Sequence, residues 1–120
     1  MRQNRGVADH VELTRADGEL VCRARVAKSF ASRFRGLMGV AQLAPGTGLL
    51  LPRTSSVHTH FMRFPIDVVF LDSELGIVSI AVALRPWRMA RATAAKSVLE
   101  LAAGECDRLE LAQGDVLLGT

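Results

Sequence analysis

Short apolar runs separated by clusters of turn residues predict a β-rich fold for this chain. His10 to Arg15 (HVELTR) alternates apolar and polar residues, the pattern of a half-buried strand. Ala16 to Gly18 (ADG) then predicts a turn and Leu20 to Ala27 the returning strand, which together form a hairpin. Ile66 to Leu71 is almost continuously apolar, which is typical of a strand covered on both faces.

Further strands follow from the same pattern, and proline breaks them where it removes a ladder donor. They are expected at Leu49 to Leu51, Val57 to Met62, Gly76 to Leu84, Ser97 to Leu101 and Val116 to Leu118. The fold class predicted is mainly β (α+β): a small, partly closed β-barrel of seven to eight short strands with one or two short helices.

The main helix is predicted over Ser29 to Met38. Ser29 can cap its first turn, and one helical face carries apolar side chains at i, i+4, i+7 and i+8. We expect that face to pack against the strand Ile66 to Leu71. The apolar face of this main helix consists of Phe30, Phe34, Leu37 and Met38. A separate, single helical turn is predicted over Gly104 to Leu109.

Length and composition indicate one globular domain over residues 1–120. The chain is 49% apolar and has only two cysteines, Cys22 and Cys106, too few for a disulfide framework. The N-terminus shows no apolar core of a signal peptide, so a cytoplasmic location is expected for the chain as given; export of a longer precursor stays open. No run of about 18 apolar residues predicts a membrane span.

The net charge is +3, and its distribution is uneven. Residues 1–35 hold eight basic and four acidic groups, whereas residues 97–120 hold one arginine and five acids. Arg85, Arg88 and Arg91 flank the only tryptophan. Either a mixed solvated surface or a basic face for an anionic partner fits this distribution. Aromatic residues make up 5% of the chain and none is tyrosine, so the composition argues against nucleic acid as a partner.

The segment His58 to Asp72 (HTHFMRFPIDVVFLD) places imidazole and charged groups beside a buried strand. His58 and His60 are two residues apart, so on a strand both face one side and form a weak candidate metal pair. Arg63 nearby disfavours a cation. We therefore predict no bound metal and no cofactor, with both imidazoles hydrogen-bonded in or near the core.

Two carboxylates in apolar strands, Asp67 and Glu100, are the other candidate site residues. Asp67 requires a cation or backbone donors, and Arg63 or Arg35 is the expected ion-pair partner. Alternatively, Asp67 is a general base in a pocket. Glu100 is also expected to face inward, where it could pair with Asp67 for acid–base chemistry.

Five sequence blocks follow one another along the chain in a recognisable order. They are RGLMG (Arg35 to Gly39), GTGLLL (Gly46 to Leu51), the segment His58 to Asp72, VLEL (Val98 to Leu101) and AAGECDRLELAQGDVL (Ala102 to Leu117). In this order they resemble domain-of-unknown-function family 192, a group of small bacterial and archaeal proteins, over roughly residues 29–118. The resemblance implies a compact β-rich domain with a partly closed barrel, and it implies no activity.

Three functions remain open from the sequence. The first is an accessory module that binds an unidentified small molecule or protein partner. The second is a metal-assisted or acid–base hydrolase using the same residues, and the third a nucleic-acid-binding barrel. The residue pattern favours the binding module over an enzyme and assigns no catalytic residue. The candidate cleft comprises His58, His60, Arg63, Asp67, Glu100 and Arg35.

Overall fold

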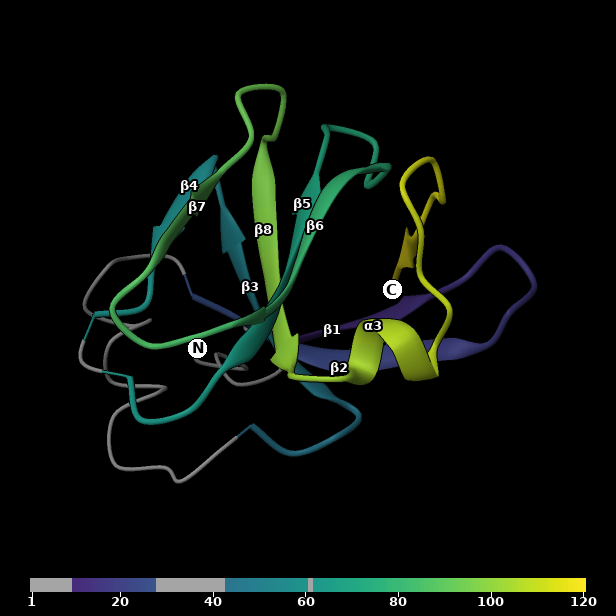
Figure 1. Cartoon of the computed structure of the whole chain (residues 1–120). Helices are drawn as coiled ribbons and strands as arrows, with labels where there is room; N and C mark the ends of the chain where they lie inside the picture. The colour runs from purple at the N-terminus through teal and green to yellow at the C-terminus, as the bar shows by residue number, and fades with distance from the viewer. Residues whose placement is uncertain (1–9, 28–42, 61) are drawn as a thin grey trace, which may run out of the picture.

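The computed structural model describes residues 10–27, 43–60 and 62–120 (Figure 1). Within this part of the chain, short strands dominate and one helical turn follows the last long strand. The elements are β1 (His10–Thr14), β2 (Leu20–Val26), β3 (Thr47–Pro52), β4 (Ser56–His58), β5 (Ile66–Leu71), β6 (Ile77–Leu84), β7 (Met89–Arg91), β8 (Ser97–Ala102), α3 (Glu105–Arg108) and β9 (Leu118–Gly119).

Seven strands form one curled sheet in the order β6-β5-β8-β3-β2-β1-β9. Neighbouring strands are antiparallel except β2 and β3, which are parallel. Strands β4 and β7 pair separately and form a two-stranded ribbon, which Figure 1 shows beside the main sheet. We call this pair the ribbon.

The C-terminal segment partly closes the sheet into a barrel. The Ile77 amide at the start of β6 donates to the Asp115 carbonyl oxygen (2.7 Å), and the Gly114 amide donates to that of Ile77 (2.8 Å). Beyond this contact, β9 pairs with β1 at the opposite edge of the sheet. The partly closed, mainly β fold predicted from the sequence is therefore confirmed.

The elements match the sequence expectations closely, with three exceptions. The first hairpin and the single turn of α3 are confirmed, and β5 is buried at every position. The strand expected over Val57 to Met62 stops at His58, and the last strand, expected over Val116 to Leu118, is found at Leu118–Gly119. Strand β7 was not predicted because three residues carry too little periodicity. The helix expected over Ser29 to Met38, with its packing against β5, lies outside the described residues.

Buried apolar side chains form two cores, one on each side of the sheet. Because side chains alternate along a strand, β5 sends Val69 and Leu71 to the first core and Val68 and Phe70 to the second. The first core includes side chains from α3 and the C-terminal segment, such as Cys106. The second includes side chains from the ribbon and the loops around it. The ribbon is therefore anchored on the second core.

Candidate functional site

Asp67 is completely buried, and backbone amides satisfy its carboxylate. Oδ1 accepts from the Ala83 N–H (2.8 Å), and Oδ2 accepts from the N–H groups of Gly104 (3.1 Å) and Cys106 (2.9 Å). The predicted ion pair between Asp67 and Arg63 is therefore wrong, because amides bind the carboxylate and Arg63 is exposed. The other expected partner, Arg35, lies outside the described residues. Ala83 (φ 50°) and Gly104 (φ 95°) have left-handed conformations, at the irregular end of the β5–β6 pairing and at the start of α3.

The two buried carboxylates do not form the predicted pair. Asp67 is opposite Leu101 in the β5–β8 register, whereas Glu100 is opposite Val68. Since cross-strand partners share a face and adjacent residues alternate, Asp67 and Glu100 point to opposite sides of the sheet. Acid–base chemistry that needs both carboxylates together is therefore excluded.

Neither cysteine is suited to act as a nucleophile. Burial raises the pKa of the Cys106 thiol to about 12, and the neighbouring Asp67 carboxylate reinforces the shift. Burial also raises the pKa of Cys22 to about 12. Both thiols are consequently protonated at neutral pH. Among residues 10–27, 43–60 and 62–120, no group of three or more histidine, cysteine or acidic side chains is placed to hold a metal ion.

Glu105 is a buried carboxylate with a structural explanation. It accepts from Arg108 Nε (2.7 Å) and Nη2 (2.9 Å), and from the Gly46 amide (3.1 Å). The hydrogen bond to Arg108 is the main reason that the pKa of Glu105 lies below its usual value. The ion pair lies within α3, and the hydrogen bond from the Gly46 amide connects α3 to the loop before β3.

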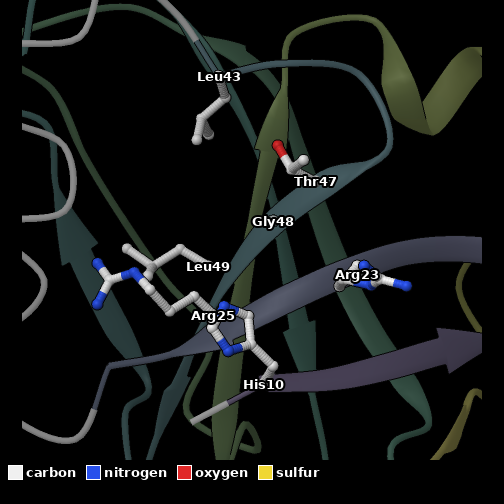
Figure 2. A pocket seen from close by; sticks show the side chains of 7 residues that line it. All are labelled: His10, Arg23, Arg25, Leu43, Thr47, Gly48 and Leu49. Carbon is white, nitrogen blue, oxygen red and sulfur yellow. The ribbon is translucent and has the colours of Figure 1, made fainter. Parts of the chain in front are cut away.

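A pocket of about 260 Å³ opens over β1, β2 and β3, lined by His10, Arg23, Arg25, Leu43, Thr47, Gly48 and Leu49 (Figure 2). Its basic side chains come from the neighbouring strands β1 and β2, in which His10 and Arg25 are directly opposite each other. Some of its polar groups are already engaged: Arg23 binds Glu12 (2.9 Å), and the Thr47 hydroxyl donates to the Ala44 carbonyl oxygen (2.7 Å). The pocket is therefore the weaker of two candidate sites.

The ribbon is the stronger candidate because its outward side collects polar and aromatic groups. Val57 and Ala90 are opposite each other and pack inward on the second core. The alternate positions therefore face outward as the pairs Ser56–Arg91 and His58–Met89. His60 and Trp87 continue this row beyond the strand ends. We call these six outward side chains the ribbon face.

Ring contacts join the aromatic members of the ribbon face. The His58 and His60 rings meet edge to face, with centroids 4.9 Å apart, and His60 meets Trp87 in the same way at 5.1 Å. Trp87 remains 55% exposed and Met89 65% exposed. The ribbon face thus presents aromatic and thioether surface to solvent.

Thr59 holds the Trp87 turn against the ribbon. Its buried hydroxyl donates to the Arg85 carbonyl oxygen (2.6 Å) and accepts from the Arg88 amide (2.9 Å). Its carbonyl oxygen accepts from the Trp87 amide (3.1 Å) and from the Met62 amide (3.2 Å). These bonds replace ladder bonds after His58, which explains why the predicted strand ends early.

We predict that Thr59→Val lowers the free energy of unfolding by about 1–3 kcal/mol, because the Arg88 amide and the Arg85 carbonyl would lose a buried partner. Thr59→Ser keeps the hydroxyl and serves as the matched control. Chemical denaturation of both variants measures the difference. Equal stability of the valine and serine variants would contradict this role for the hydroxyl.

Positive charge is concentrated in the sequence segments that carry the ribbon face. The sequence has no acidic residue over 20–66 or over 75–99, and these two segments hold eleven of the 15 lysine and arginine residues. Arginines lie exposed on both sides of the ribbon face in sequence. We call Arg53, Arg63, Arg85 and Arg88 the flanking arginines.

The structure brings together part of the cleft expected from the sequence. His58 and His60 are in contact, and Arg63 follows them closely in the chain. Asp67 and Glu100 belong to the interior of the sheet. Trp87 and Met89 were not among the predicted site residues, although the arginines around the only tryptophan gave a signal for that segment.

Comparison with known proteins identifies the family. The model of domain-of-unknown-function family 192, described as an uncharacterized ACR, matches residues 11–119, and the chain belongs to this family. A UPF0127 protein of Thermococcus sibiricus is 37% identical over 98 residues, covering 78% of this chain and 63% of the relative. A UPF0127 protein of Pyrococcus furiosus is 36% identical over 103 residues, covering 82% and 88%. The chain thus spans less than two thirds of the length of the Thermococcus sibiricus relative.

Two crystal structures share the fold. A Sinorhizobium meliloti protein, provisionally described as a transcription regulator, superposes with a TM-score of 0.78 at 28% identity, covering 92% of both chains. A Novosphingobium aromaticivorans protein of unknown function gives a TM-score of 0.75 at 23% identity, covering 91% of this chain and 83% of its own. The second similarity shows the fold alone.

Proposed function

We propose that this member of domain-of-unknown-function family 192 is a binding domain that holds an anionic partner on the ribbon face and its flanking arginines. The observation that carries the proposal is the concentration of exposed arginine in the two sequence segments that form the ribbon and its turns, which contain no acid. Each guanidinium can donate two parallel hydrogen bonds to a phosphate or carboxylate. Among the ion pairs of the described residues, none involves a flanking arginine, so most of these donors are open to a partner.

The remainder of the site favours binding over catalysis. The buried Asp67 carboxylate is engaged by three amides. The buried Glu105 carboxylate of α3 is held by Arg108. The description of the Sinorhizobium meliloti protein as a regulator of transcription is in keeping with an anionic partner, because such regulators act on nucleic acid. In the described part of the chain, no helix is long and apolar enough to cross a membrane.

The proposal is tested with long-chain inorganic polyphosphate as the probe. Each cation near a strongly anionic surface contributes on the order of 1 kcal/mol, so the double variant Arg88→Gln/Arg91→Gln should bind about 30-fold more weakly. The affinity of the wild type should fall steeply with added salt. Isothermal titration or a competition assay provides the dissociation constants.

The charge-matched control is Arg23→Gln/Arg108→Gln, which removes two cations that already pair with Glu12 and Glu105. We expect this control to change the affinity much less, once thermal melts show that both double variants are folded. Equal losses in the two double variants, or no salt-dependent binding by the wild type, would defeat the proposal.

A further inference from the structure

We infer that the partner of the ribbon face is a single-stranded nucleic acid, whose bases stack on Trp87 while its phosphates bind the flanking arginines and Arg91. This inference rests on the proposed function and specifies its partner. It is carried by the conformation and exposure of Trp87, the support that His60 gives it, and the positions of the arginines.

Trp87 is held in a conformation that core packing does not explain. Its φ is 62°, in the left-handed region that bulky side chains rarely adopt. Hydrogen bonds to Thr59 fix the amides of Trp87 and Arg88 in this turn. Backbone strain of this kind persists where surrounding structure imposes it, and it is frequent at binding sites. Here it directs the largest side chain of the protein to the surface, where 55% of the residue is exposed.

The neighbouring imidazole leaves indole surface accessible. The ring planes of His60 and Trp87 are inclined by 75°, so the contact is edge to face and does not stack the two rings. His60 thereby fixes the indole from one side. A base can stack on the exposed part of the indole, a contact that contributes about 1–3 kcal/mol and tolerates any base.

Cations occur on both sides of this stacking position. Arg85 and Arg88 precede and follow Trp87 in the same turn, and Arg91 ends β7, which begins two residues after Trp87. At about 3.3 Å per strand residue, Arg91 lies about 7 Å along β7 from Met89. A backbone that follows the ribbon would therefore meet arginine on each side of a stacked base. Arginine also suits this role because its planar group binds phosphate through two donors.

Other anionic partners fit these features less well. In a duplex, the bases are stacked on one another, so an exposed indole has no base face to contact. An anionic lipid surface would favour a broad apolar face, whereas the ribbon face offers only Trp87 and Met89 as large apolar groups. Both partners are therefore outcomes that the experiment must distinguish.

Because Trp87 is the only tryptophan in the chain, its fluorescence reports directly on this site. We expect a single-stranded oligothymidylate to quench the fluorescence of the wild-type protein to a saturating value. An abasic oligonucleotide of equal length should bind at least about fivefold more weakly, because it loses the stacking contribution. This comparison uses the unaltered chain and does not depend on how a variant folds.

A second measurement uses Trp87→Leu and the fluorescence anisotropy of labelled oligonucleotides. The variant should lose at least about fivefold in affinity for oligothymidylate, and a smaller factor for polyphosphate. Equal binding of oligothymidylate and its abasic analogue without quenching would overturn the inference, while binding of polyphosphate would keep the proposed function. Tighter binding to duplex DNA or to phosphatidylglycerol vesicles would also overturn it. Failure to bind any polyanion would overturn both.

Discussion

Replacing Asp67 by asparagine should lower the free energy of unfolding by about 2–5 kcal/mol, since each buried donor without a partner costs about 1–3 kcal/mol. The carboxylate accepts hydrogen bonds from three amides, one on Oδ1 and two on Oδ2. An asparagine amide has a single acceptor oxygen, and its NH₂ group would face at least one of those donors. The substitution also removes the negative charge that strengthens all three bonds.

Thermal and chemical denaturation of the Asp67→Asn variant measure this effect, and Asp107→Asn at an exposed position of α3 provides the control. The expected loss follows from the function of Asp67 as a connection among β5, the end of β6 and the entrance to α3. If Asp67 were instead a general base under functional strain, its neutralisation would leave stability equal or higher. An unchanged or raised melting temperature would thus refute the structural assignment.

Phe70→Ala should cost about 3–5 kcal/mol, the range for truncating a fully buried aromatic ring. Phe70 is 1% exposed on β5 and belongs to the second core, which also contains Val57 of the ribbon. The cavity would therefore weaken both the sheet and the support of the ribbon face. Chemical denaturation measures the loss.

The control for Phe70→Ala is Val82→Ala on β6, where the wild-type residue is 60% exposed. We expect the control to change stability by less than about 0.5 kcal/mol, as surface substitutions usually do. If Phe70→Ala cost no more than this control, the second core would not support the sheet as described.

Strand patterning predicted much of the fold because a strand buried on one side alternates apolar and polar residues, and a strand buried on both sides is continuously apolar. The first hairpin shows the first pattern and β5 the second, and the family resemblance agreed with the result. The three-residue strand β7 could not be predicted in this way. The early end of β4 was also hidden, because it depends on the hydrogen bonds of Thr59 to a turn about 26–29 residues away.

The candidate site was harder to predict because it depends on spatial contacts. The sequence indicated that Asp67 needs a cation or backbone donors. Backbone amides are the donors in the structure, and two of them belong to the left-handed residues Ala83 in β6 and Gly104 before α3. It could not show that Asp67 and Glu100 face opposite sides, since this depends on the β5–β8 register. Low aromatic content argued against a stacking surface, yet composition cannot reveal that His58, His60 and Trp87 are in contact.

The central claim, that the ribbon face and its flanking arginines form the binding surface, is tested most directly by backbone amide chemical shifts. Nitrogen-labelled protein would be titrated with polyphosphate and then with oligothymidylate. We predict that the largest changes occur in β4, β7 and the turn at Arg85 to Arg88. Changes concentrated instead around His10, Arg25 and Leu49, the pocket over β1 to β3, would contradict the claim.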